Sequence, residues 1–158
     1  ITQLLGSQND MATIRLVLIY QFMKDNSTSE RKAMEKIPGI TFVPGLKQEK
    51  FSFQMTDQEK EDRKHFYEEK FREVVKKAQE ENYDVLFLDE IIYTIRAGLF
   101  DEELLIRWLR EKPEHLEVIL TGQDPGEELT ACADYVSELK KIRHPFDRGL
   151  AARDGIEK

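Results

Sequence analysis

Two adjacent carboxylates, Asp89 and Glu90, end the sequence YDVLFLDE at residues 83–90. A short apolar run of this kind is typical of a strand that is buried on both faces of a parallel sheet. In open α/β sheets, ligands bind beyond the carboxyl ends of the strands, so both acids are predicted to lie at a ligand site. Such carboxylates can hold Mg²⁺, because hard cations prefer oxygen ligands. The alternative is that Asp89 only caps a helix beginning near Ile91.

Other kinds of chemistry find little support in the sequence. The three histidines, His65, His115 and His144, are far apart, and none belongs to a His-x-x-x-His or Cys-x-x-Cys pattern, so no local zinc motif exists. There is no Gly-x-Ser-x-Gly sequence, which excludes the usual α/β-hydrolase nucleophile. Cys132 falls on a predicted short amphipathic helix, where a packing role is expected.

The elements that must position the two acids alternate between strand and helix. Strands are predicted at residues 15–22, 40–43, 85–88, 117–122 and 135–139. Capping boxes at residues 27–30 and 56–59 open two helices, and the second should bury Tyr67, Phe71, Val74 and Ala78. Asp101 caps a helix that must stop before Pro113, and the pair at residues 124–125 opens a short one. This alternation predicts a three-layer α/β domain with a parallel or mostly parallel sheet.

Length and composition narrow the class of protein. A chain of 158 residues fits one domain, expected to span residues 1–158. The net charge of −7 and the pI of about 5.1 disfavour nucleic acid as a partner. No apolar run is long enough to cross a membrane, and the start lacks the pattern of a secretory signal. The single cysteine cannot form an internal disulfide, so a cytoplasmic location is expected.

Several segments, taken in order, resemble one known family. They are VLIYQFMK, ERKAMEKIPGITFV, KFSF, YDVLFLDEIIY, VILTG, ADYVSELKKIRHPFDRG and GIE, and the resemblance runs from about residue 17 to residue 157. The family is the P-loop ATP:corrinoid adenosyltransferases, which implies a RecA-like P-loop NTPase fold. It also implies a transferase in which Co(I) of a reduced corrinoid, cob(I)alamin or another, attacks the 5′ carbon of ATP and the triphosphate leaves. Because Co(I) is the nucleophile, such a protein aligns its substrates and needs no Ser, Cys or general base.

The resemblance also assigns roles to residues. It makes Glu90 a ligand of Mg²⁺ on the triphosphate, with Asp89, the neighbouring acid of the same catalytic motif, as the other candidate ligand. Phe51 and Phe53 fall where the family places aromatic rings against the corrinoid, helping to remove its lower axial ligand so that cobalt can be reduced. Without the resemblance, the alternation of KFSF is more typical of core residues in a short strand.

The nucleotide-binding residues implied by the resemblance are Gly6, Thr121 and Gln123, and here the chain departs from the family pattern. No lysine is followed by serine or threonine, so the Gly-Lys-[Ser/Thr] phosphate loop is missing near residues 6–16. Only ten residues separate Gly6 from the strand at Val17, too few for a loop and a crossover helix. Gln123 stands where the family usually has arginine, and Ile92 where some members have threonine.

Three functions follow from these observations. The first is a corrinoid adenosyltransferase that uses ATP and Mg²⁺, acts as a homodimer as family members commonly do, and receives electrons from a reductant such as a flavoprotein. The second is a noncatalytic relative that binds corrinoid without ATP. The third is a generic P-loop nucleotide hydrolase, to which KFSF and the C-terminal motif lend no support.

Overall fold

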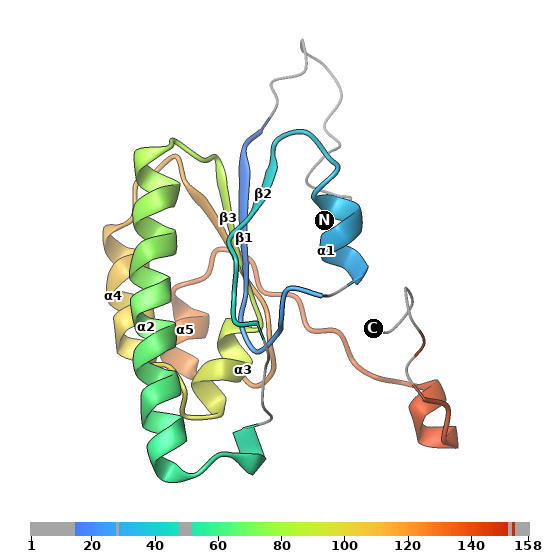
Figure 1. Cartoon of the computed structure of the whole chain (residues 1–158). Helices are drawn as coiled ribbons and strands as arrows, with labels where there is room; N and C mark the ends of the chain where they lie inside the picture. Colours follow the sequence, from blue (N-terminus) through green and yellow to red (C-terminus); the bar gives the residue numbers. More distant parts are fainter. Residues whose placement is uncertain (1–14, 28, 48–51, 152, 154–158) are drawn as a thin grey trace.

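The computed structural model describes residues 15–27, 29–47, 52–151 and 153 of the chain (Figure 1). In these residues the strands are β1 (Val17–Gln21), β2 (Ile40–Phe42), β3 (Val85–Asp89) and β4 (Glu117–Leu120). The helices are α1 (Ser29–Met34), α2 (Asp57–Glu80), α3 (Ile91–Arg96), α4 (Glu102–Glu111) and α5 (Glu127–Ala131), with 3-10 turns η2 (Ser52–Gln54) and η3 (Pro145–Arg148). None of the helices in the described ranges is both long and apolar enough to cross a bilayer.

The sheet is parallel throughout its described strands, in the order β2-β1-β3-β4. Helix α1 covers one face, and α2 and α4 cover the other, which gives three layers (Figure 1). This confirms the predicted α/β class. Gln21 pairs in register with Asp89, and Leu88 with Leu120, so β1, β3 and β4 end side by side.

Helix α2 forms as its sequence predicts. Thr56 is the N-cap: its hydroxyl accepts from the N–H of Glu59, and the Glu59 carboxylate accepts from the N–H of Thr56. This confirms the second capping box. The four residues expected to face the core, Tyr67, Phe71, Val74 and Ala78, are all buried, together with Val75.

The sheet separates two cores of unequal size. Alternate residues of β1 point to opposite faces, so Leu18 and Tyr20 join the core against α2, while Val17 and Ile19 join the core against α1. Counted over the part of the chain that the structure describes, the first core has 20 buried residues and the second has four, so most of this buried apolar surface lies on the α2 side. The fully buried β1 confirms the prediction of a strand covered on both faces.

Two predictions about the C-terminal third are wrong. Residues 135–139 form no strand; Tyr135 and Leu139 are 94% and 96% exposed, and this segment runs away from the sheet (Figure 1). Apolar alternation makes a strand only where a neighbouring strand supplies hydrogen bonds. The short helix also starts later than predicted, because Asp124 adopts a positive φ of 52° and Gly126 is the N-cap.

Candidate functional site

The carboxylate of Asp89, at the end of β3, ties three parts of the sheet edge together. Its Oδ1 accepts from the hydroxyl of Thr121, 2.8 Å away, just beyond β4. Its Oδ2 accepts from Lys24 Nζ at 2.9 Å and from Gln21 Nε2 at 3.1 Å. The alternative that Asp89 only caps α3 is wrong, because the N-cap is Glu90 and it makes no side-chain capping bond.

Glu90 is held in an unusual backbone conformation. Its φ of 62° and ψ of 15° lie in the left-handed region, which costs a non-glycine residue about 1 to 3 kcal/mol and is typical of functional sites. The Glu90 N–H donates to the hydroxyl of Thr121 at 2.9 Å, and its carbonyl accepts from the N–H and hydroxyl of Thr94 at 3.0 and 2.8 Å. These bonds fix the residue that carries the second acid.

The side chain of Glu90 is partly buried, and its carboxylate accepts no hydrogen bond from the described residues. Burial raises the pKa of the Glu90 carboxyl above its usual value, the charge of Asp89 raises it further, and Lys24 opposes the rise. An unpaired carboxylate in such surroundings gains from a bound cation.

Lys24 and Glu30 complete the polar network. Lys24 Nζ lies 3.3 Å from Glu30 Oε1, which also accepts from Gln21 Nε2 at 3.2 Å. Burial alone would lower the pKa of Lys24, but the hydrogen bonds and charges of Asp89 and Glu30 outweigh it and raise the pKa. Burial alone would raise the pKa of Glu30, but its own backbone N–H, Gln21 and Lys24 lower it. Both groups are therefore charged at neutral pH.

The segment after β4 packs tightly against α3. Gly122 has a φ of 143°, and a Cβ on it would lie 2.5 Å from the backbone nitrogen of Tyr93. The carbonyl of Thr121 accepts from the N–H of Ile92 at 3.1 Å. Glycine is required at this close approach, which holds the first turn of α3, and with it Glu90, against the end of β4.

The loop that carries Lys24 is anchored to the loop that follows β2. Asn26 Oδ1 accepts from the N–H of Gly45 and from Arg31 Nη1, both at 2.8 Å. A Cβ on Gly45 would lie 3.4 Å from the carbonyl oxygen of Lys24, so the two loops are in contact. The β1–α1 connection, η2 and α3 lie at the same end of the sheet (Figure 1), which is the end where β1 and β3 finish.

The remaining predicted site residues are more scattered. Phe53 lies on the 3-10 turn η2 with 78% of its surface exposed, so the interpretation of this residue as strand core is wrong. Gln123 is exposed two residues beyond Thr121, and no bond between it and the Asp89 network exists within the described residues. Phe51 and Gly6 lie outside the described residues.

The parallel register brings together residues that the sequence interpretation missed, namely Gln21, Lys24 and Glu30. One signal was available. Gln21 ends an apolar strand, and a polar residue buried to 8% exposure there must find hydrogen-bond partners. Its partners, Asp89 and Glu30, come from β3 and from α1.

The amino-acid sequence was compared with models of known protein families and with curated proteins. The family model described as ATP:corrinoid adenosyltransferase BtuR/CobO/CobP matches residues 9–157 of the chain. The chain belongs to the ATP:corrinoid adenosyltransferase family. Its parallel sheet with helices on both faces is consistent with the P-loop NTPase type of fold in this family.

Individual relatives match over different lengths. A corrinoid adenosyltransferase from Sinorhizobium sp. is 30% identical over 141 residues, which are 88% of this chain and 65% of that protein. The corrinoid adenosyltransferase of Escherichia coli K12 is 35% identical over 74 residues, and that of Salmonella typhimurium LT2, CobA, is 36% identical over 74 residues. The latter two matches each cover 47% of this chain and 38% of the relative. The chain therefore spans just under two thirds of the first relative and less of the others.

Proposed function

We propose that this protein is a corrinoid adenosyltransferase that transfers the 5′-deoxyadenosyl group of ATP to Co(I) of a reduced corrinoid. The electron pair of Co(I) forms the cobalt–carbon bond, the bond between C5′ and the phosphate oxygen breaks, and triphosphate leaves with that bond's electrons. The observation that carries the proposal is the unpaired, partly buried carboxylate of Glu90 at the carboxyl edge of a parallel sheet, in a chain of this family.

Glu90 is the residue that we propose as a ligand of Mg²⁺. Within the described ranges, no group of three or more His, Cys, Asp or Glu side chains can hold a metal by itself. Mg²⁺ suits such a site, because it is usually bound by one or two carboxylates together with water and substrate phosphates. When bound, the ion neutralises charge on the leaving triphosphate. Both oxygens of Asp89 already accept hydrogen bonds, so we assign Asp89 the role of positioning its neighbours in the same motif.

The nucleotide side of the site is proposed to include Gly6, Thr121 and Gln123. The hydroxyl of Thr121 bonds to Asp89 and to the N–H of Glu90, so it acts by holding these two residues. The exposed amide of Gln123 can donate to a phosphate oxygen. Such a neutral contact is weaker than the charge-assisted bond of an arginine, which contributes about 1.5 to 3 kcal/mol.

The corrinoid side of the site is proposed to include Phe53, together with Phe51. An aromatic ring that is 78% exposed has no role in the core and offers apolar surface to the flat face of a corrinoid. Displacement of the lower axial ligand would make the cobalt easier to reduce to Co(I). A flavoprotein reductant, a homodimeric assembly and a cytoplasmic location belong to the same proposal.

The test is anaerobic incubation of the protein with ATP, Mg²⁺ and chemically reduced cob(I)alamin. We expect a light-sensitive product with a cobalt–carbon bond, seen in its absorption spectrum. Phe53→Ala should raise the KM for corrinoid and leave the KM for ATP unchanged, while Phe53→Tyr, which keeps the ring, should behave like the unaltered protein. Failure to form any product would overturn the proposal.

A noncatalytic corrinoid-binding protein is the second candidate, and one observation favours it: no lysine in this chain is followed by serine or threonine. It predicts corrinoid binding of equal strength with and without ATP, and titration of the corrinoid spectrum in both conditions separates the two functions. The third candidate, a nucleotide hydrolase, would release phosphate from ATP without any corrinoid.

A further inference from the structure

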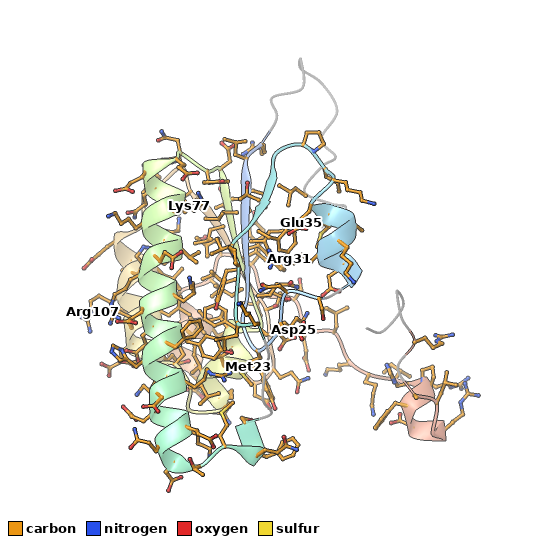
Figure 2. All side chains as sticks on the ribbon, in the orientation of Figure 1. Met23, Asp25, Arg31, Glu35, Lys77 and Arg107 are labelled. Atoms are coloured by element: carbon orange, nitrogen blue, oxygen red, sulfur yellow. The ribbon has the colours of Figure 1, made fainter. Side chains whose placement is uncertain are left out.

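Lys24 lies at the carboxyl edge of the sheet, three residues beyond the last residue of β1. Its Nζ contacts Asp89 Oδ2 at 2.9 Å and Glu30 Oε1 at 3.3 Å, and 32% of its side chain remains exposed. The group is therefore held in place by two carboxylates and is still accessible to a ligand from solvent. Its chain neighbours Met23 and Asp25 also lie at this end of the molecule (Figure 2).

The bonds that hold Lys24 leave part of it available. An ammonium group has three N–H donors, and Asp89 and Glu30 each take one. No further acceptor for it is present in the described part of the chain. Lys24 contacts Asp89 Oδ2 at 2.9 Å, and Asp89 directly precedes Glu90, so the ammonium group and both acids belong to the same edge of the sheet. A ligand bound at this edge can therefore reach the remaining donor of Lys24.

The charges around Lys24 decide which ligand suits it. Two carboxylates, Asp89 and Glu30, contact the one ammonium group, and Glu90 follows Asp89 in the chain, so the cluster is negative as a whole and repels a bare anion. A magnesium complex of a triphosphate avoids this repulsion, because its cation meets the carboxylate of Glu90 and a phosphate oxygen meets Lys24.

We propose that Lys24 binds a phosphate oxygen of magnesium triphosphate, that Asp89 positions its ammonium group for this contact, and that Glu30 competes with the phosphate for it. The proposal rests on the function proposed above and assigns the positive charge that the triphosphate requires. Lysine suits the role, since it binds phosphate as a point charge and needs no planar geometry.

The test is calorimetric titration of the full chain with inorganic tripolyphosphate and Mg²⁺, which needs neither corrinoid nor turnover. We expect Lys24→Gln to weaken binding by at least about tenfold, because a charge-assisted hydrogen bond is lost. Lys24→Arg, which keeps the charge, should stay within about threefold of the unaltered chain. Lys77→Gln is the control. Lys77 bonds to Glu81 at the end of α2, on the other side of the sheet from α1 (Figure 2), so this variant should bind magnesium tripolyphosphate as tightly as the unaltered chain does.

A second variant separates phosphate binding from a structural role. Glu30→Gln removes a carboxylate that competes with phosphate for Lys24, and we expect it to tighten binding of magnesium tripolyphosphate by about two- to fivefold. If Lys24 only stabilised the fold, loss of the Glu30 charge would relieve general repulsion alone and would tighten binding by less than about twofold. This variant also decides the matter should Lys24→Gln fail to fold, since tightening by less than about twofold, or weaker binding, by Glu30→Gln overturns the proposal.

The outcomes for Lys24 and for the proposed function remain distinct. If the unaltered chain and Lys24→Gln bind magnesium tripolyphosphate equally, the role of Lys24 is overturned while the adenosyltransferase proposal stands. If tripolyphosphate binds equally well without Mg²⁺, the shared site with Glu90 is overturned. If the unaltered chain binds none under either condition, the role of Lys24 falls, and the product assay with cob(I)alamin decides the proposed function separately.

Discussion

The two faces of the sheet differ in how they are stabilised and in what they carry. Among the described residues, the face toward α2 and α4 holds 20 buried residues in one core, whereas the face toward α1 holds four. The loop that carries Lys24 follows Phe22, and Phe53 lies two residues before Met55; both Phe22 and Met55 belong to the larger core. Most of the apolar burial among the described residues therefore lies on one face, and this core supports the carboxyl edge of the sheet where the ligand contacts are proposed.

The larger core owes its strength to aromatic rings from several elements. Phe71 of α2 lies edge-on to Phe100 and Trp108, with ring centroids 5.2 and 5.5 Å apart. Such edge-to-face pairs add about 0.5 to 1.5 kcal/mol each beyond the area that they bury. On the other face, Phe42 is buried but its recorded ring contact is with Arg31, whose Cζ lies 5.3 Å from the ring centroid.

Replacement of one phenylalanine on each face gives the largest expected difference. Phe71→Ala should lower the free energy of unfolding by about 3 to 5 kcal/mol, because it opens a cavity among rings that cannot easily move. Phe42→Ala should cost less than about 3 kcal/mol, since fewer neighbours surround the ring and α1 can settle into the space. Urea unfolding of both variants measures the two values. Equal losses would mean that the smaller core is as rigid as the larger one.

A smaller effect is expected where the two halves of the site meet, at Thr121. Thr121→Val removes the hydroxyl that donates to Asp89 and accepts from Glu90. The free energy of unfolding should fall by about 1 to 3 kcal/mol, because the Asp89 carboxylate oxygen and the Glu90 N–H each lose this partner. Thr121→Ser keeps the hydroxyl and should cost less than about 1 kcal/mol, for the lost methyl group. Thermal unfolding compares the two. A Val variant as stable as the Ser variant would show that these hydrogen bonds do not hold the sheet edge together.

Much of the fold was predictable from local pattern. The apolar run before Asp89 specified a buried parallel strand, and Thr56 with Glu59 specified the start of α2. The spacing of Tyr67 and Phe71 identified its buried face. These elements are set by burial and capping within short segments, which is the information that a sequence displays directly.

The parts that could not be predicted depend on partners distant in the sequence. The apolar alternation of residues 135–139 resembles a strand, but this segment has no strand partner in the described residues. The bond from Lys24 to Asp89 joins residues 65 positions apart and follows from the register of β1 against β3. The left-handed backbone of Glu90 depends on hydrogen bonds with Thr94 and Thr121. A glutamate at position 90 does not indicate this conformation, which is more typical of glycine.

The smallest expected effect is the contribution of the Glu90 carboxyl to folding stability. The direction in which this contribution changes with pH can be worked out from the pKa shift. The pKa of Glu90 is raised in the folded state above the ordinary value of 4.5, so the folded protein holds the proton more tightly than the unfolded chain does. This contribution to stability is fully present below pH 4.5 and is lost as the pH rises through the folded pKa. The Glu90 carboxyl therefore stabilises the fold less at pH 7 than below pH 4.5.

Glu90→Gln should accordingly raise the Tm at pH 7 in metal-free buffer by about 1 to 3 °C, and the difference should vanish below pH 4.5. Glu61→Gln, on an exposed position of α2, is the matched control and should change little at either pH. Magnesium tripolyphosphate should reverse the order at pH 7, because only the unaltered chain gains a ligand for the cation. A lower Tm for Glu90→Gln in metal-free buffer would mean that the carboxylate already has a favourable partner in the fold, and the physical basis for a cation at Glu90 would be lost.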